Sequence, residues 1–361
     1  MLLRKIICNI GALLFIFKRK SIDRAKIRKI AVIKSGAIGD ILMSTPFLRA
    51  LRKGFPDAII DFHLGKWSAG ALKNNSDLTN LFEYNDSIFH SLNISGKIQL
   101  IKKLRAQKYD LLFILDKSYL ANLLGFAAGI KYRIGFNRYG EGFPNTQNVR
   151  YGPVRHEIEY YLDLARLIGI KESNKQLELN GSKEDKKYVD KLTKNIKSYI
   201  GIIPGGAKNP GRGVVDSRRW PIEKFIELVS LVKNKYTVLL LGGKSDFELN
   251  EEIIAQIESK NIFNFAGKTS ISQSCELMRR CKYIICSDSG PMHIAAASGT
   301  KVISLFGPTN PARKAPLTKD SVALWKDKDI YDDSVEVYGT DPSHAQYFRR
   351  LSVQDVLANI D

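Results

Sequence analysis

Residues 30–40 read IAVIKSGAIGD, and the rest of the chain repeats the pattern that this stretch begins. Its first part, Ile30 to Lys34, is a short β-branched run of the kind that forms a buried strand. A loop with two glycines follows, and after Asp40 the apolar residues recur on one helical face at Ile41, Leu48, Leu51 and Phe55. The stretch therefore predicts a strand, a glycine-rich turn and a helix, which is one unit of a parallel α/β sheet.

The same alternation of apolar runs and helical stretches continues along the chain. In the first half we expect two further strands, at Ala58 to Leu64 and Asp110 to Leu115, and a helix from Glu157 to Ile168. The strands expected in the second half are Tyr199 to Ile203, Thr237 to Leu241, Tyr283 to Cys286 and Val302 to Phe306. Ligands of open parallel sheets bind beyond the carboxyl ends of the strands, so the chemistry is expected in the loops there.

Changes in composition divide the chain into five predicted parts. A basic and apolar segment at 1–28 precedes an N-terminal Rossmann-like domain at 29–175, and a polar, charge-rich linker follows at 176–197. A C-terminal Rossmann-like domain is expected at 198–330. The last segment, 331–361, ends in an amphipathic stretch that must pack on something already folded.

The charge balance limits the class of partner. The chain has 361 residues, with 56 lysines and arginines against 37 aspartates and glutamates, which gives a net charge of +19. Its hydrophobic share of 44% and charged share of 26% exclude long disorder and a multi-span membrane protein. Such a surface attracts polyanions, so nucleic acid, anionic lipid and phosphorylated substrates all stay open. The four cysteines have no metal-binding or disulfide spacing, which favours a reducing compartment.

An apolar run near the N-terminus, Ile6 to Phe17, lies between two basic clusters. It is too short to cross a bilayer, which takes about 20 residues in a helix. We favour a helix that lies in the membrane interface with its cations on lipid phosphates. A buried first helix and a cleaved signal peptide are the alternatives.

The first strand-end loop carries Gly36, Gly39 and Asp40. The glycines allow a ligand to approach the backbone at a helix start. Their spacing is not the G-x-G-x-x-G fingerprint, which argues against a dinucleotide-dependent dehydrogenase. Two roles are open to Asp40: it is an N-cap of the helix, or it is a carboxylate that accepts a proton from an attacking hydroxyl.

A second loop, rich in glycine and cations, follows the strand that ends at Ile203. Its candidate residues are Gly205, Gly206, Lys208, Arg212, Arg218 and Arg219. Although Gly206 and Gly211 have the Walker spacing, no Lys-Ser or Lys-Thr pair follows them, which argues against a P-loop kinase. The cations are suited to a diphosphate, and the alternative is a solvated basic loop. After the next strand, Asp246 or Glu248 is a candidate acceptor for ribose hydroxyls.

The third loop leads from a strand into a helix of small residues. Its candidate residues are Asp288, Ser289, Gly290 and His293. Asp288 and Ser289 are suited to cap that helix, whose first N–H groups attract anions. No G-x-S-x-G elbow surrounds Ser289, which argues against a serine hydrolase. For His293, a packing role and a contact to phosphate or sugar are both open.

Six motifs in order resemble those of the family 9 glycosyltransferases, the heptosyltransferases of lipopolysaccharide core assembly. They are GAIGD at 36–40 with PFLRALR at 46–52, PGGA at 204–207, RRWP at 218–221, FAGKT at 265–269, DSGPMHIAAA at 288–297 and LFGPTNP at 305–311. Two features depart from the family pattern: the loop between Gly206 and Arg218 is long, and arginine stands where lysine is frequent.

The resemblance implies a GT-B fold, with two Rossmann-like domains facing a cleft and a C-terminal helix that crosses back to the first domain. It also implies inverting transfer of heptose from ADP-heptose to the lipid A-linked inner core, without metal or cofactor. By motif, Asp40 would be the catalytic base, with Gly36 and Gly39 on the acceptor side. The donor side would comprise Gly205, Gly206, Lys208, Arg218, Arg219, Asp246, Asp288, Ser289, Gly290 and His293.

These expectations also concern partners and location. The positive charge fits an acidic glycolipid acceptor and an anionic membrane surface, so we expect a cytoplasmic protein peripheral to the inner face of the inner membrane. Nucleic acid is disfavoured, because no RNP-type motif, zinc spacing or recognition helix is present. The alternatives are a GT-B transferase of another nucleotide sugar to a surface glycan, and a non-transferase nucleotide-sugar enzyme or binding scaffold.

Overall fold

The computed structural model describes residues 21–91, 93–152, 154–206, 216–331 and 347–361. It contains two compact units. Unit 1 comprises the residues up to Ala37 together with Ser44–Lys175, and unit 2 comprises Ile38–Met43 together with Gln176–Asp361. The short segment Ile38–Met43 therefore groups with unit 2, although it lies within the range predicted for the N-terminal domain.

Unit 1 is built on a six-stranded parallel sheet. In spatial order its strands are β3 (Asn80–Tyr84), β2 (Ile59–Gly65), β1 (Lys29–Ile33), β4 (Leu111–Ile114), β5 (Tyr132–Asn137) and β6 (Gln147–Arg150). Its helices are η1 (Arg24–Lys26), α3 (Thr45–Gly54), α4 (Lys66–Ala69), α5 (Ser87–His90), α6 (Ile94–Ala106), α7 (Tyr119–Ala127) and α8 (Glu157–Arg166).

Unit 2 is built on a second six-stranded parallel sheet. In spatial order its strands are β12 (Val322–Trp325), β11 (Lys301–Phe306), β10 (Tyr283–Ser287), β7 (Tyr199–Ile203), β8 (Thr237–Leu240) and β9 (Ile262–Asn264). Its α-helices are α2 (Ile38–Leu42), α9 (Lys183–Leu192), α10 (Ile222–Val232), α11 (Phe247–Ala255), α12 (Ile271–Met278), α13 (Gly290–Ser298), α14 (Pro311–Lys314) and α16 (Val353–Leu357). Short 3-10 turns are η2 (Asp216–Arg218), η3 (Lys244–Asp246) and η4 (Lys328–Ile330).

Both sheets have the same strand order when each is numbered from its own first strand, namely 3-2-1-4-5-6. The order reverses between β1 and β4 in unit 1 and between β7 and β10 in unit 2. This is the doubly wound topology of Rossmann-like domains, whose ligands bind at the carboxyl ends of the strands next to the reversal. The predicted fold class, two Rossmann-like parallel-sheet domains, is confirmed.

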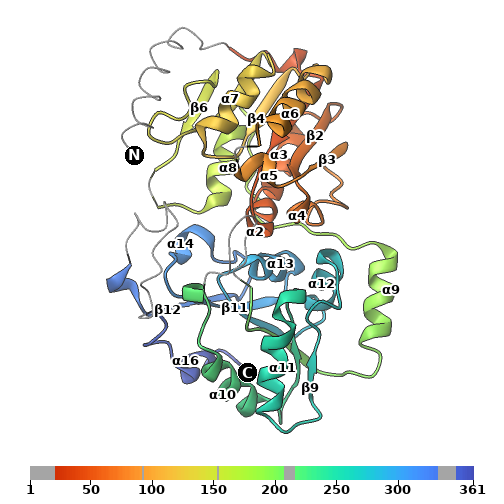
Figure 1. The fold of residues 1–361 in the computed structure, drawn as a ribbon, viewed down its shortest axis with the longest axis vertical. Coiled ribbons are helices and arrows are strands. Elements are labelled where there is room, and N and C mark those ends of the chain that lie inside the picture. Colours follow the sequence, from red (N-terminus) through yellow and green to blue (C-terminus); the bar gives the residue numbers. More distant parts are fainter. Residues whose placement is uncertain (1–20, 92, 153, 207–215, 332–346) are drawn as a thin grey trace. The chain divides into compact units, whose positions relative to one another are not determined.

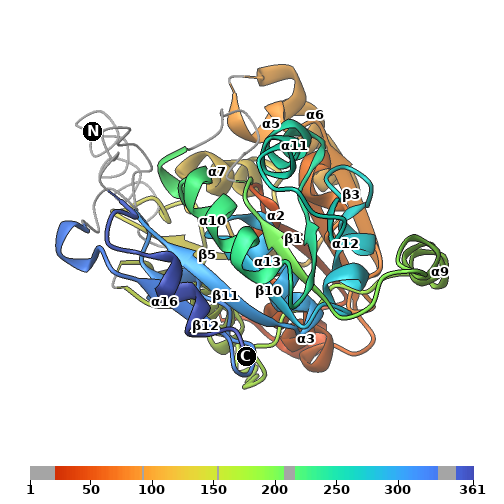
Figure 2. The ribbon, with the colours of Figure 1, turned by 90° about the horizontal axis from the view of Figure 1, so that it is seen from below.

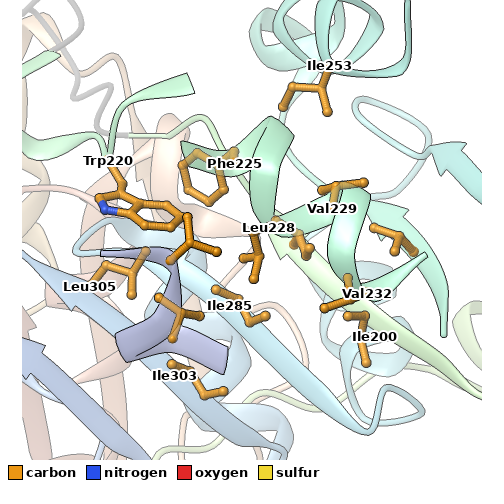
Figure 3. Close-up of a cluster of buried hydrophobic side chains, with 14 of the residues drawn as sticks. Ile200, Trp220, Phe225, Leu228, Val229, Val232, Ile253, Ile285, Ile303 and Leu305 are labelled. Atoms are coloured by element: carbon orange, nitrogen blue, oxygen red, sulfur yellow. The ribbon is translucent and has the colours of Figure 1, made fainter. Parts of the chain in front are cut away.

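The core of unit 2 explains why α10 forms where it does. Phe225, Leu228, Val229 and Val232 recur at helical spacing, and all four are buried. Figure 3 shows these side chains with Trp220 against the strand residues Ile285, Ile303 and Leu305. Trp220 is 1% exposed, so its side chain anchors the RRWP motif, and with it Arg218 and Arg219, to this core.

The C-terminal segment does not pack where the resemblance implied. Residues 347–361 complete the core of unit 2, where Leu351 and Val356 are fully buried and α16 lies beside α10 (Figure 2). Trp220 Nε1 donates to the Leu351 carbonyl at 3.2 Å, and Lys224 Nζ donates to the same carbonyl at 2.7 Å. The predicted return of the C-terminal helix to the first domain is therefore wrong for these residues, because their apolar side chains are used in unit 2.

The structure differs from the prediction at the helix after Asp40 and at the linker. The helix expected after Asp40 is divided into α2 and α3, with Pro46 in the first turn of α3, where proline is tolerated. The stretch expected as a linker contains α9, which packs on α12.

The predicted membrane-interface segment lies mostly outside the described residues, since 1–20 are not among them. Along the described part of the chain, no helix combines the length and apolar composition that a bilayer crossing requires.

Candidate functional site

Two of the predicted loops of unit 2, the glycine-rich loop after Ile203 and the loop that carries Asp288, meet where the strand order reverses. The loop from Pro204 to Gly206 leaves the end of β7, and Asp288 and Ser289 leave the end of the neighbouring strand β10. Gly206 has a φ of +88°, which favours glycine, and a Cβ atom on it would lie 2.8 Å from Ser289 Oγ. The two loops are therefore in contact, as the parallel topology requires. Lys208 and Arg212 lie outside the described residues.

A buried ion pair joins the RRWP motif to the third loop. Arg218 NH2 donates to Asp288 Oδ2 at 2.6 Å, and the same oxygen accepts a hydrogen bond from Thr309 Oγ1 at 2.6 Å. Asp288 is 2% exposed. Burial by itself would raise the pKa of Asp288, but Arg218, Lys314, the Thr309 hydroxyl and His293 together lower it to about 2. Asp288 is therefore ionised at neutral pH and fixes the Arg218 guanidinium.

Two polar atoms of this pair retain bonding capacity. Arg218 Nε and Asp288 Oδ1 are buried and have no hydrogen-bond partner among the described residues. Unpaired buried polar atoms are rare in folded proteins, and at a strand-end loop they indicate a place for a further group. An N–H donor of a fixed cation there can bind an anionic oxygen.

Asp246 and Arg219 hold the backbone of the glycine loop at Gly206. Asp246 Oδ1 accepts from Gly206 N at 3.1 Å, and Asp246 Oδ2 accepts from Gly243 N at 2.8 Å. Arg219 NH2 donates to the Gly206 carbonyl at 2.9 Å. A Cβ atom on Gly205 would lie 2.3 Å from Asp246 Oδ1, so only glycine fits beside this carboxylate. The structure gives Asp246 backbone partners, and its predicted contact with a ribose stays a prediction.

The helix α13 begins at this site. Ser289 is its N-cap residue by position, but its side chain makes no capping hydrogen bond, and Ser289 Oγ donates to the Ser287 carbonyl at 3.2 Å. The expected cap by Ser289 is therefore absent, because the hydroxyl is turned back to β10. The helix presents its N-terminus, with the partial positive charge of its first N–H groups, next to the Arg218–Asp288 pair.

Helix α2 packs on α13 within unit 2. A Cβ atom on Gly39 would lie 2.4 Å from His293 Cδ2, and one on Gly290 would lie 3.6 Å from Ile38 Cβ. Asp40 is half-buried in the first turn of α2, two residues inside the helix start. It is therefore not an N-cap, and that alternative is excluded. His293 is 4% exposed and fills the space beside Gly39, so a packing role is present.

Unit 1 has a polar contact at its own strand-order reversal. Lys34 Nζ, at the end of β1, donates to Asp116 Oδ1 at 2.9 Å, and Ser35 N donates to Asp116 Oδ2 at 2.7 Å. Gly36 follows with a φ of +128°, a conformation that residues with a side chain rarely adopt. Asp116 thus holds the start of the first loop. Gly36 lies in unit 1 and Gly39 in unit 2.

Sequence reasoning did not find Thr309, Lys314 or Asp116. Thr309 belongs to the LFGPTNP motif, and that motif was the only signal for it. Asp116 directly follows a predicted strand, so its position after a strand was a usable signal. Among the described residues, no three His, Cys, Asp or Glu side chains form a group suited to a metal ion.

Known proteins share both the sequence pattern and the fold. The sequence profile of glycosyltransferase family 9 (heptosyltransferase) matches residues 97–337. Lipopolysaccharide heptosyltransferase 2 of Escherichia coli K12 is 31% identical over 314 residues, covering 80% of this chain and 86% of its own length. The lipopolysaccharide core heptosyltransferase OpsX of Haemophilus influenzae is 24% identical over 343 residues, covering 92% of this chain and 93% of its own length.

Solved structures agree with the sequence comparison. The structure of the E. coli ADP-heptose lipopolysaccharide heptosyltransferase II superposes with a TM-score of 0.73 at 26% identity, covering 92% of this chain and 97% of that one. A family 9 glycosyl transferase from Veillonella parvula shares the fold, with a TM-score of 0.81 at 21% identity, covering 94% of this chain and 97% of that one. Two Rossmann-like units with glycine and cation loops at the strand ends match the GT-B architecture of these glycosyltransferases. The chain belongs to glycosyltransferase family 9, the heptosyltransferase family.

Proposed function

We propose that this protein transfers heptose from ADP-heptose to the inner core of lipopolysaccharide, with inversion at the anomeric carbon. Family membership supports the transfer. The curated relatives are lipopolysaccharide heptosyltransferases, and the similar solved structure is described as an ADP-heptose enzyme. The reaction occurs at the inner face of the inner membrane, where a lipid A-linked acceptor and anionic lipid suit the net charge of +19.

In this reaction the acceptor hydroxyl oxygen attacks the anomeric carbon of the heptose. The bond from that carbon to the diphosphate breaks on the opposite face, and ADP leaves. Asp40 accepts the hydroxyl proton as general base. The packing of α2 on α13 carries this assignment. The Gly39–His293 contact holds α2, which carries Asp40, against α13, whose N-terminus adjoins the Arg218–Asp288 pair.

Negative charge grows on the departing diphosphate and has to be stabilised. Arg218 offers a fixed cation with an unpaired buried Nε, and the N-terminus of α13 offers its partial positive charge. A preorganised donor of this kind contributes about 3 kcal/mol to lowering the barrier. Gly205 and Gly206 let the diphosphate approach the loop backbone, while Asp246 and Arg219 hold that loop in shape.

The deciding experiment uses purified protein with a panel of nucleotide sugars and truncated core acceptors, with product masses as the readout. We expect one heptose to be added per acceptor with ADP-heptose and ADP to be released, and we expect no transfer from UDP-glucose. Efficient transfer from another sugar nucleotide would replace heptose in the proposal. Release of free sugar in every mixture without acceptor product would point to a hydrolase instead.

A further inference from the structure

Two neighbouring helices of unit 1 cover the same face of its sheet. Leu100 and Leu104 of α6 and Leu124 of α7 share one buried cluster with Leu112 and Ile114 of β4. The opposite sides of α6 and α7 therefore face away from the sheet and form one surface (Figure 1).

Large apolar side chains on this surface lie together. Arg105 of α6 donates to the Ala127 carbonyl of α7 at 2.6 Å, which joins the C-terminal ends of the helices. Because α6 and α7 each return between parallel strands, they run in the same direction. Ile98 lies two turns before Arg105 in α6, and Leu120 lies two turns before Ala127 in α7. Ile98 and Leu120 are therefore at the same height along the two helices. Ile98 is 47% exposed and Leu120 is 44% exposed.

One turn before Ile98, at the start of α6, Ile94 extends the patch, and it is 69% exposed. We call the outward surface that carries Ile94, Ile98 and Leu120 the α6–α7 face. Single exposed apolar residues are ordinary, but exposed apolar side chains that form a contiguous patch are a recognised mark of an interaction surface.

The charge along α6 has one sign. Residues 93–109 contain five basic residues and no acidic one, the basic residues being Lys97, Lys102, Lys103, Arg105 and Lys108. Residues 117–140 also contain no acidic residue, but Arg133 is buried, and Lys117 and Arg138 are paired with Glu157 and Glu141, so the charge of this face is argued from α6. Lys102 is exposed, one turn after Ile98 on the outward side of α6. Apolar side chains beside the exposed cations of α6 are complementary to an anionic lipid surface.

We propose that the α6–α7 face docks unit 1 on an anionic membrane, with Ile94, Ile98 and Leu120 entering the interface and Lys102 meeting lipid phosphates. The choice of a membrane also rests on the proposed function, since a lipid A-linked acceptor is found there. The N-terminal ends of α6 and α7 lie at the carboxyl edge of the sheet, as do Lys34 and Asp116. Docking through this face brings that edge to the level of lipid headgroups.

The test is sedimentation of the full-length protein with vesicles of phosphatidylglycerol and phosphatidylcholine. The double variant Ile94→Ser/Ile98→Ser is expected to bind about tenfold more weakly than the unaltered protein. Lys102→Gln is expected to weaken binding about fivefold, since one surface cation contributes about 1 kcal/mol. The matched controls are Leu231→Ser and Lys187→Gln, which alter equally exposed residues of unit 2 and should bind as before. Equal binding by all four variants would overturn the proposal.

A second measurement reports insertion itself and does not depend on overall affinity. Tryptophan emission of Ile98→Trp should shift to the blue when vesicles are added, and brominated lipid should quench it, whereas Leu231→Trp should stay unchanged. A shift that occurs without vesicles and rises with protein concentration would show that the face binds a second copy of the chain, and would overturn the membrane assignment.

A transfer assay with a soluble acceptor separates the docking proposal from the proposed transfer reaction. With a lipid-free, water-soluble core acceptor, the Ile94→Ser/Ile98→Ser variant should transfer sugar at the rate of the unaltered protein. Weaker vesicle binding with unchanged soluble transfer supports the face. If the unaltered protein transfers no sugar but binds vesicles through Ile94 and Ile98, the proposed reaction fails and the docking face stands.

Discussion

Gly39 of α2 lies so close to His293 of α13 that a Cβ atom added to Gly39 would be 2.4 Å from His293 Cδ2. Real Cβ contacts are essentially never that short, so the pair fixes how near the two helices come. Asp40 follows Gly39 in the same turn of α2. The position of the proposed base therefore depends on the absence of a side chain at residue 39.

Replacing Gly39 with alanine should push α2 away from α13. We expect unfolding to become easier by about 1–3 kcal/mol, because overpacking at a tight contact is costly. Transfer should fall about 10²-fold, since a displacement of about 1 Å can misplace a catalytic group. Thermal unfolding and kcat/KM measure the two effects. Gly152→Ala is the control, because a Cβ at Gly152 meets nothing within 4 Å.

A second substitution tests the cause of that loss. If the clash with the imidazole is responsible, adding His293→Ala to Gly39→Ala should restore part of the lost stability. The coupling free energy between the two substitutions should then be favourable. Strictly additive effects would mean that the two residues do not contact each other in solution.

Removing the carboxylate of Asp40 should separate binding from chemistry. Asp40→Ala is expected to bind ADP as the unaltered protein does and to transfer sugar 10²–10⁴-fold more slowly, the usual range for losing a general base. Calorimetric titration with ADP and initial rates are the measurements. Asp57→Ala, which removes an exposed carboxylate of unit 1, is the control. Turnover that is unaltered in Asp40→Ala would remove the base assignment.

The ion pair between Arg218 and Asp288 should matter for stability and for donor binding. Asp288→Asn keeps the shape of the side chain but leaves the half-buried Arg218 charge without its counter-ion. We expect a loss of about 3–5 kcal/mol in the free energy of unfolding and weaker ADP binding. Thr309→Val removes only the second hydrogen bond to Asp288 Oδ2 and should cost about 1–2 kcal/mol. Equal losses in both variants would contradict a dominant ion pair.

The lowered pKa of Asp288 gives stability a defined pH dependence. Its pKa of about 2 lies below the ordinary 3.8, so the ionised form stabilises the fold above pH 4, and this contribution is lost as the pH falls towards 2. Between pH 5 and pH 3 the loss should be about 1 kcal/mol. Urea unfolding of the unaltered protein and of Asp288→Asn measures it. A difference between the two proteins that stays constant over this range would show that Asp288 is not the titrating group.

The buried central strands of both sheets could be predicted from the sequence because each is a short apolar run. The edge strands were missed, since an edge strand is only partly buried and lacks a continuous apolar run. In β3 only Tyr84 is buried, and β12 has no buried residue. Strand β5 was missed for another reason. It contains a buried arginine, Arg133, whose Nε donates to the Pro144 carbonyl at 2.9 Å, and a charged residue breaks the apolar pattern of a strand.

The candidate site could be located from its glycines but not resolved into partners. Gly205 and Gly206 marked a loop that needs backbone approach, and the structure has both at the strand-order reversal. The partners of Asp288 are 70 and 21 residues away in sequence, and no local pattern encodes such a distance. For the same reason the sequence could not tell that Asp246 serves the backbone of two glycine loops.

The grouping of Ile38–Met43 with unit 2 has a consequence for dividing the protein. A fragment that begins at Gln176 would contain the entire second sheet but would lack α2, leaving the flank of His293 uncovered. Supplying that fragment with a synthetic peptide of residues 38–43 is unpromising, because six residues seldom form a helix unaided. The second unit thus takes six of its residues from the first half of the chain, and a single cut at residue 176 does not divide the protein along its structural units.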